Sequence, residues 1–357
     1  MQPLPKYRRG LTDEEILRFA GTGKPVRGIS PYVLKGMAEW IRVSSEIRKL
    51  YEKAKSLELE MIKKVLERAE VVCGTNSSAG IEYLKSVSFD AVFIDEATQA
   101  TEPSCLIPLV KGRKLVMAGD HRQLPPTVIS MEARELTYSL FERLMDICGS
   151  RISEMLRVQY RMNERIMKFP SETFYGGKLV ADGSVRNHTI ADLGFDLSKV
   201  KGFLQDVLSP ENVVVFVAVK GAEHRRRGST SYMNEKEAHA VAEIVENLLR
   251  GGLGEDHIGV ISPYEDQVDL ISRMVPVEVR TVDGFQGREK EVIIVSFVRS
   301  NPEGDTGFLK DYRRLNVAIT RARRKLIAVG DPETLASDSI YRSFIEYVKR
   351  NGLFKEL

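Results

Sequence analysis

Several features that define other classes of protein are scarce or missing in this chain of 357 residues. Its three cysteines (Cys73, Cys105 and Cys148) show no paired spacing, which argues against a disulfide framework or a zinc site. The five histidines are scattered and form no metal cluster. No run of 18 apolar residues occurs and residues 1–5 do not resemble a signal peptide. We therefore expect no membrane segment and a cytoplasmic or otherwise intracellular location.

The composition is typical of an α/β protein with one large core or two ordinary ones, because 43% of the residues are hydrophobic and 29% are charged. A net charge of +3 is too small to indicate nucleic-acid binding by itself. Local basic clusters are compatible with such binding. These clusters are Lys6 with residues 8–9, residues 225–227, and Arg321 with residues 323–325.

The most informative stretch is residues 91–96, where a short apolar run ends on Asp95 and Glu96. A buried strand with two carboxylates at its carboxyl end is the usual way to hold Mg²⁺ beside a nucleoside triphosphate. In this interpretation Asp95 holds the metal and Glu96 polarises the attacking water. The dipeptide alone is also compatible with the end of a strand and the cap of the next helix.

A second apolar run, residues 115–118, leads into a loop over residues 119–126. Gln123 in this loop can both donate and accept a hydrogen bond, so it suits a sensor that touches the γ-phosphate and the attacking water. Pro125 and Pro126 stiffen the loop, so that a small movement there is transmitted. The pair of strands, each followed by polar residues, favours a phosphate site over a solvated turn.

Three later motifs make the pattern specific: residues 159–162, residues 281–289 and residues 315–324. With them the chain resembles the superfamily 1B helicases, in the branch of the nonsense-mediated-decay helicase, the immunoglobulin mu-binding helicase and the Dna-two nuclease-helicase. The match covers about residues 71–350 with the motifs in the family's order. It implies an α/β fold of two RecA-like parallel-sheet domains, the first of them incomplete, with an N-terminal helical arm.

The resemblance implies ATP and Mg²⁺ as cofactors and assigns roles to single residues. Arg161 and Arg321 would act as arginine fingers, because a planar guanidinium suits phosphate oxygens. Glu289 matches the residue that accepts a hydrogen bond from the ribose. The expected catalytic residues are Asp95, Glu96, Gln123, Arg161 and Arg321, and the expected cofactor-binding residues are Asp95, Gln123, Arg161, Gly287, Glu289 and Arg321.

Single-stranded nucleic acid, DNA or RNA, is the partner that the resemblance implies, and the sequence does not distinguish the two. Tyr264 would stack a base, a sequence-tolerant contact, although an aromatic packed beneath a loop is nearly as good an interpretation. The residues expected to contact the strand are Thr75, Asn76, Ser77, Pro263, Tyr264, Gln267 and Thr281.

One element of the family is missing from the expected pattern: the phosphate loop G-x-x-x-x-G-K-[ST]. The nearest segment is residues 20–25. When Gly23 and Lys24 are aligned with the motif, Arg18 stands where the first glycine belongs and Pro25 where the Mg²⁺-binding hydroxyl belongs. We therefore expect the C-terminal motor half of an ATP-dependent 5′–3′ helicase that is inactive alone. Two alternatives stay open: a non-catalytic nucleic-acid-binding module, and one subunit of a split helicase whose phosphate loop comes from an N-terminal polypeptide.

The expected organisation has three parts. Residues 1–70 form loops with one short helix and a helical arm over residues 32–69, residues 71–150 the remainder of the first RecA-like domain, and residues 151–357 the second. The arm is either an insert or an ordinary helix packed on the first domain. Strands are expected over residues 71–75, 91–94, 115–118, 212–219, 258–262, 277–281, 292–297 and 325–329. Helices are expected over residues 134–147, 234–249, 265–274 and 311–321.

Overall fold

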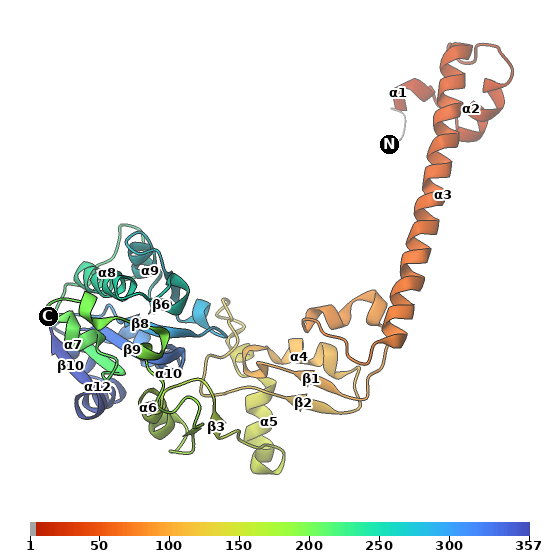
Figure 1. Ribbon diagram of the computed structural model, residues 1–357. Helices are drawn as coiled ribbons and strands as arrows, with labels where there is room; N and C mark the ends of the chain where they lie inside the picture. Colours follow the sequence, from red (N-terminus) through yellow and green to blue (C-terminus); the bar gives the residue numbers. More distant parts are fainter. Residues whose placement is uncertain (1–4) are drawn as a thin grey trace. The chain divides into compact units, whose positions relative to one another are not determined.

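The computed structural model describes residues 5–357 (Figure 1). The chain divides into two compact units. The first comprises Met1–Val92 and Leu106–Lys114, and the second comprises Phe93–Cys105 and Leu115–Leu357. Residues 1–4, part of the expected N-terminal loops, lie outside the described residues. The division places Asp95 and Gln123 in the same unit as Arg321, whereas the expected boundaries at residues 70 and 150 assign them to different domains.

The first unit begins with three helices, α1 (Pro5–Arg8), α2 (Asp13–Ala20) and α3 (Pro31–Arg68). A capping box starts α2, since Thr12 accepts from the Glu15 backbone N–H and the Glu15 carboxylate accepts from the Thr12 N–H. Ser30 caps α3, which has a proline at its first position. Their apolar side chains form a small core between α2 and the start of α3, so this region holds two short helices where one was expected.

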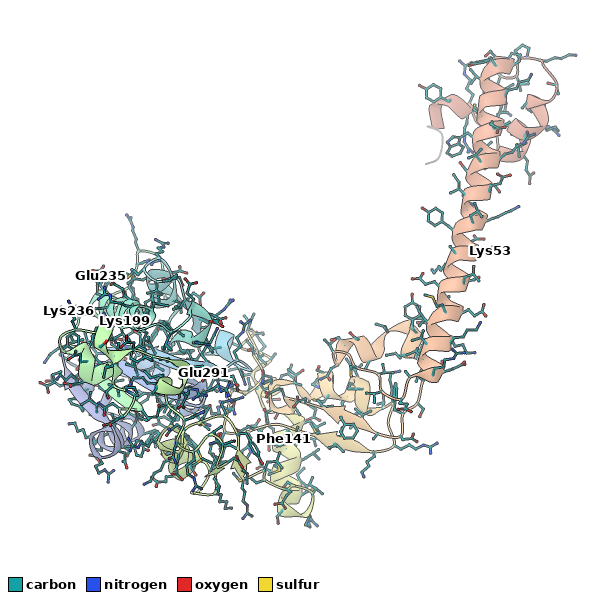
Figure 2. The ribbon with its side chains drawn as sticks, in the orientation of Figure 1. Lys53, Phe141, Lys199, Glu235, Lys236 and Glu291 are labelled. Atoms are coloured by element: carbon teal, nitrogen blue, oxygen red, sulfur yellow. The ribbon has the colours of Figure 1, made fainter. Side chains whose placement is uncertain are left out.

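The arm over residues 32–69 is a single helix and not a hairpin, as Figure 1 shows for α3. Only residues in its first third are buried. The apolar stripe that follows is exposed, from 54% for Leu57 to 66% for Leu50, with Met61 and Val65 between these values. Lys53 projects from the same stretch (Figure 2). This exposure does not fit one of the two interpretations of the arm, an ordinary helix packed on the first domain. The other interpretation, an insert, stays a prediction.

The segment that follows α3 is not a strand, which corrects the expectation for residues 71–75. A strand needs a neighbour that satisfies its backbone groups, and these five residues form no ladder with any described strand. Val71 is 77% exposed. Two 3₁₀ turns follow, η1 (Ser77–Gly80) and η2 (Glu82–Leu84).

A two-stranded sheet of β1 (Val92–Ile94) and β2 (Leu115–Met117) confirms the next two expected strands. Around it lie η3 (Ala97–Gln99), α4 (Glu102–Leu109), η4 (Arg134–Thr137), α5 (Leu140–Cys148) and η5 (Gly149–Arg151). The helix expected over residues 134–147 is thus split, because Ser139 and Glu142 form a capping box that starts α5 anew. A bidentate ion pair between Arg143 and Glu102 ties α5 to α4.

The large sheet of the second unit has six parallel strands in the order β10-β5-β9-β8-β6-β7. They are β5 (Val214–Ala218), β6 (Ile258–Ser262), β7 (Glu278–Thr281), β8 (Lys290–Ser296), β9 (Ala322–Gly330) and β10 (Leu353–Glu356). The longer helices are α6 (Glu164–Phe174), α8 (Glu235–Arg250), α9 (Glu265–Ser272), α10 (Tyr312–Thr320) and α12 (Ser339–Asn351). The remaining elements are β3 (Val158–Gln159), β4 (Val180–Ala181), η6 (Ile190–Leu193), η7 (Leu197–Lys199), α7 (Leu204–Leu208), η8 (Glu255–His257), η9 (Asp283–Phe285), η10 (Gly307–Lys310) and α11 (Pro332–Leu335).

Both faces of this sheet are buried, which explains why its strands read as continuous apolar runs. In β5, Phe216 packs on the side of α6, α10 and α12, while Val215 and Val217 pack on the side of α7, α8 and α9. The same alternation holds along β9. Every strand and helix expected in the second half is present within a few residues of its predicted ends, and the α/β parallel-sheet fold with an N-terminal helical region is confirmed.

Candidate functional site

The carboxyl end of β1 carries Asp95 and Glu96, both exposed. Glu96 has a left-handed backbone with φ 49°, which is uncommon for a residue with a side chain and is found where the surrounding structure imposes it. Its carboxylate accepts a 2.7 Å hydrogen bond from the Gln99 amide, and the Asp95 carboxylate accepts from the Glu96 N–H at 2.9 Å. The turn holds the two acids at the end of the strand, where α/β sheets bind ligands.

Backbone hydrogen bonds join this turn to the end of β2. The Ala118 N–H donates to Ile94 O at 2.9 Å, and the Ala97 N–H donates to Ala118 O at 2.8 Å. The loop that follows β2 is ordered by Asp120, whose carboxylate accepts from the Arg122 N–H at 2.9 Å and from the Gln123 amide at 2.8 Å. The two segments expected to form one site therefore lie side by side.

Arg321 reaches this loop from the start of β9. It is 3% exposed, and its Nη2 donates to Gln123 Oε1 at 3.1 Å. Its other donors meet backbone carbonyls and the Thr320 hydroxyl, and among residues 5–357 it makes no ion pair with a carboxylate. Burial lowers the pKa of this guanidinium to about 10, with repulsion from Arg161 adding to the effect and Glu96 opposing it. A buried cation that has no ion-pair partner among the described residues is the arrangement expected of an anion site.

Arg161 lies nearby on the segment between β3 and α6. Its guanidinium pairs with Glu289, just before β8, and donates to Thr320 O at 3.4 Å. Gly287 is exposed in the same loop as Glu289, with φ +74°, a backbone conformation that favours glycine. The structure thus brings together, at the amino ends of β8 and β9, most of the residues expected to bind the nucleotide.

Two residues in this region were given no role by the sequence analysis. Tyr175 donates a 2.5 Å hydrogen bond to the Asp120 carboxylate and accepts a 2.7 Å bond from the Asn316 amide. Asn316 also donates to Arg122 O at 2.8 Å. Asn316 lies inside the motif over residues 315–324, so the sequence indicated the segment but not the role of this side chain. Tyr175 follows α6 and has no sequence signal apart from the two glycines after it.

The residues expected to contact nucleic acid in the first unit form a polar turn. The Thr75 hydroxyl is 2.8 Å from the Ser78 hydroxyl and accepts from the Ser78 N–H at 3.2 Å. Thr75 and Ser77 are exposed, and Asn76 is half-buried. The turn offers hydroxyl groups to a ligand although the strand expected before it is absent.

At the carboxyl ends of β6 and β7, the expected contact residues differ in accessibility. Pro263 and Thr281 are half-buried, whereas Tyr264 is 7% exposed and Gln267 is fully buried. The Gln267 side chain accepts from the Asn234 N–H and donates to Asn234 O and to the Ser296 hydroxyl. Gln267 therefore has no surface to present to a strand, which corrects its expected role. For Tyr264 the structure favours the packed alternative.

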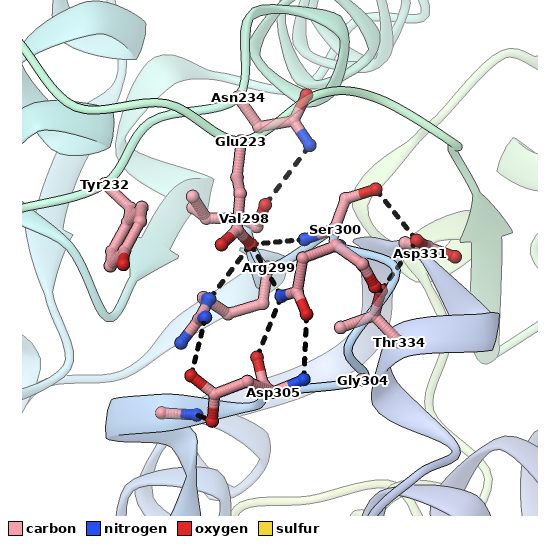
Figure 3. Close-up of polar contacts among 12 residues, drawn as sticks. Glu223, Tyr232, Asn234, Val298, Arg299, Ser300, Gly304, Asp305, Asp331 and Thr334 are labelled. Atoms are coloured by element: carbon pink, nitrogen blue, oxygen red, sulfur yellow. Dashed lines mark hydrogen bonds and ion pairs between the residues drawn. The ribbon is translucent and has the colours of Figure 1, made fainter.

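The loop after β8 packs against Tyr264 through Phe308, with 6.2 Å between the ring centroids. A polar network centred on the buried Arg299 holds this loop (Figure 3). Arg299, 3% exposed, pairs with Glu223 at 2.9 Å and with Asp305 at 3.1 Å. Its guanidinium also lies over the Tyr232 ring, 4.7 Å from the centroid. A cavity of about 420 Å³ opens beside this network. Its accessible lining includes Arg225, Tyr232, Pro263 and Phe308.

Within the described residues no group of three or more His, Cys, Asp or Glu side chains is placed to hold a metal. Magnesium at a nucleotide site is commonly held by one or two carboxylates together with phosphates and waters. The exposed Asp95 carboxylate, whose described hydrogen bond is to one backbone N–H, fits that requirement. No helix in the described part of the chain has the length and apolar character needed to cross a membrane.

Comparison with known proteins agrees with this architecture. Residues 34–131 and residues 136–333 match two family descriptions, each named "AAA domain". The chain belongs to this family and, within it, to the superfamily 1B, Upf1-like helicases.

Among its relatives, the chain is 46% identical over 354 residues to the "Uncharacterized ATP-dependent helicase MJ0104" of Methanocaldococcus jannaschii, covering 98% of this chain and 52% of that protein. It is 37% identical to "DNA-binding protein SMUBP-2" of Rattus norvegicus, covering 86% of this chain and 32% of that protein. The chain thus spans about half, or less, of the length of these relatives. A solved arterivirus helicase (nonstructural protein 10) shares 18% identity over 71% of this chain and 41% of that one, with a TM-score of 0.36.

Proposed function

We propose that this chain is the C-terminal motor part of an ATP-dependent, 5′–3′ nucleic-acid helicase or translocase. The buried guanidinium of Arg321 carries the proposal. It has no carboxylate partner among the described residues and is hydrogen-bonded to Gln123, beside the turn that bears Asp95 and Glu96. The triphosphate of ATP would supply the direct ion-pair partner that Arg321 lacks, and the relatives' printed names include ATP-dependent helicases.

Each residue has a distinct part in hydrolysis. Asp95 would hold Mg²⁺, which neutralises charge on the phosphate oxygens when it is bound. Glu96 orients and polarises the attacking water, while Gln123 contacts the γ-phosphate. Arg161 and Arg321 stabilise charge that develops on the transferred group, an effect worth about 10³-fold or more in rate for an arginine finger. The Glu289 carboxylate, which is paired with Arg161 in the structure, would leave that ion pair and accept a hydrogen bond from the ribose hydroxyl.

The phosphate loop is proposed to come from residues other than 21–25. That segment follows helix α2 and not a strand, and Lys24 in it is exposed. A phosphate loop joins a strand to a helix, so that backbone N–H groups surround the phosphates. We therefore expect the chain alone to hydrolyse ATP negligibly, because a metal ion and two arginines do not position the β- and γ-phosphates without a phosphate loop around them. Because residues 21–25 do not form a phosphate loop, the experiment must also distinguish a split helicase and a non-catalytic module.

The decisive assay compares ATP hydrolysis by the chain alone with hydrolysis by a fused enzyme, in which the remaining part of the Methanocaldococcus jannaschii relative is joined to the chain in that relative's order. The fused enzyme should hydrolyse ATP, with stimulation by single-stranded DNA or RNA, and Glu96→Gln or Arg321→Ala should abolish the activity. Hydrolysis by the chain alone at several per second, an ordinary enzyme rate, would show that residues within it bind phosphate. A fused enzyme that binds single strands but never hydrolyses ATP would favour the non-catalytic alternative.

The track for single-stranded nucleic acid is proposed to lie along the carboxyl ends of β6, β7 and β8. Pro263, Thr281 and the cavity beside Phe308 are accessible there, and Arg225 supplies positive charge. The turn at Thr75, Asn76 and Ser77 is proposed as a further phosphate contact. Binding should be nearly independent of sequence and should weaken steeply with salt, because phosphate contacts release counterions.

A further inference from the structure

A chain of side-chain hydrogen bonds connects the loop after β2 with helix α10. It runs from Arg321 to Gln123, from Gln123 to Asp120, and from Asp120 to Tyr175. Asn316, on α10, closes it by donating to both the Tyr175 hydroxyl and Arg122 O. All of these groups belong to the second compact unit.

The orientation of each group in this chain is determined by its neighbours. Arg321 can only donate, so Gln123 offers it the amide oxygen and turns its NH₂ to Asp120. Arg122 O can only accept, so the Asn316 NH₂ must face it and Tyr175. The Tyr175 hydroxyl accepts a hydrogen bond from this NH₂ and donates its own proton to the Asp120 carboxylate. Burial, together with the charge of Asp120, raises the pKa of Tyr175, so the hydroxyl stays a donor.

The geometry points to Tyr175 as a positioning residue for the proposed ATP hydrolysis. Through the Asp120 carboxylate it fixes the direction of the Gln123 amide, and through Asn316 it attaches the same loop to α10, the helix that directly precedes Arg321. Displacement of Gln123 by a γ-phosphate would thus be passed to α10 by hydrogen bonds. This inference rests on the proposed function for the reaction, but its structural part concerns the chain alone.

Tyr175→Phe tests the inference, because it removes the hydroxyl and keeps the ring. In the isolated chain we expect hydrogen exchange at the amides of residues 119–123 to quicken by about tenfold, the effect of losing one hydrogen bond to a charged group. Exchange in β8 should not change. The matched control is Tyr312→Phe. Tyr312 lies on α10, and its hydroxyl donates a 2.8 Å hydrogen bond to the Asp338 carboxylate, which is not part of the chain of bonds.

In the fused enzyme, Tyr175→Phe should lower kcat for ATP about tenfold with less than a twofold change in KM, because Gln123 and Arg321 act on the transition state. Tyr312→Phe should leave both constants unchanged. A double-mutant cycle of Tyr175→Phe with Asn316→Ala should show non-additive losses in kcat, as expected for groups in direct contact.

The outcomes separate the two proposals. The role of Tyr175 would be overturned if hydrogen exchange became faster across the whole sheet, or if it did not become faster at residues 119–123. The same follows if the fused enzyme hydrolyses ATP and Tyr175→Phe leaves kcat unchanged, and the proposed function then stands. If the local exchange responds as expected but the fused enzyme never hydrolyses ATP, the positioning contact stands and the proposed function fails.

Discussion

Arg321 and Gln123, 198 positions apart in the sequence, are joined by a hydrogen bond of 3.1 Å between Nη2 and Oε1. Gln123 follows β2 and Arg321 precedes β9, so the bond links the loop beside the Asp95–Glu96 turn to the six-stranded sheet. Arg321 is buried and its pKa is lowered to about 10, first by burial and then by repulsion from Arg161. This residue is held in an electrostatically unfavourable position, which is common where function and not stability fixes a side chain.

The cost of that position can be measured with Arg321→Met. Replacing a buried cation that has no ion-pair partner among the described residues by an apolar side chain of similar length should change the free energy of unfolding by less than about 1 kcal/mol, or raise it. Arg299→Met is the matched control. Arg299 is equally buried but paired with Glu223, so its loss should cost about 3–5 kcal/mol. Urea unfolding of both variants gives the comparison, and equal losses would contradict it.

The buried carboxyl of Glu237 should make stability depend on pH. Burial raises its pKa from 4.5 to about 8, although the Val298 N–H and the Ser296 hydroxyl donate to it. A raised pKa means that the folded state holds the proton more tightly, so the contribution is complete below pH 4.5 and is lost as pH rises to about 8. In that window each pH unit should cost about 1.4 kcal/mol.

Glu237→Gln removes this titration and keeps an acceptor for the Val298 N–H and the Ser296 hydroxyl, while the weaker 3.3 Å bond from the Asn234 amide to the other oxygen is lost. The difference in unfolding free energy between wild type and variant should therefore grow in favour of the variant from pH 5 to pH 8, the window set by the raised pKa. Measuring the difference, and not the wild type alone, separates Glu237 from Lys325. Burial lowers the pKa of Lys325 to about 7, which gives stability the opposite slope above that pH. Parallel curves for the two proteins would show that Glu237 is charged throughout.

Elements with strong periodic patterns were predictable, and those that depend on distant partners were not. The second sheet was found strand by strand because burial on both faces leaves continuous apolar runs such as β5. Residues 71–75 contain the same kind of run but form no strand, since a strand exists only when a neighbour pairs with it. The apolar stripe of α3 left two interpretations open for a similar reason: the pattern shows an amphipathic helix and does not show what covers it.

At the site, sequence reasoning identified Asp95, Glu96 and Gln123 because short motifs follow apolar strands. Their catalytic roles stay predictions. It missed Tyr175, because a lone tyrosine after a helix carries no signal of the partner that its hydroxyl reaches 55 residues away. It also read Gln267 as a surface contact, since a motif gives the identity of a side chain and not its exposure.

Phe308 is an exposed aromatic residue beside the proposed track. The residue is 47% exposed, and the Arg314 guanidinium lies over its ring, 3.8 Å from the centroid. Phe308→Ala should weaken binding of a fluorescent single-stranded oligonucleotide, by an amount equivalent to about 1–3 kcal/mol for a stacked base. Tyr138→Ala is the control, because Tyr138 is 44% exposed in the same unit but remote in sequence from the track motifs. Equal affinities of wild type and Phe308→Ala would remove this residue from the track.

Gln267→Ala distinguishes a structural role from a nucleic-acid contact. The substitution leaves the buried Asn234 N–H and the Ser296 hydroxyl each without one partner, so the free energy of unfolding should fall by about 1–3 kcal/mol. Affinity for a single-stranded oligonucleotide, measured well below the unfolding transition, should stay within twofold of wild type, because the side chain is fully buried. A stable variant with much weaker binding would restore the contact that the sequence motif suggested. A destabilised variant that binds normally would establish that this glutamine acts by joining α8, α9 and β8.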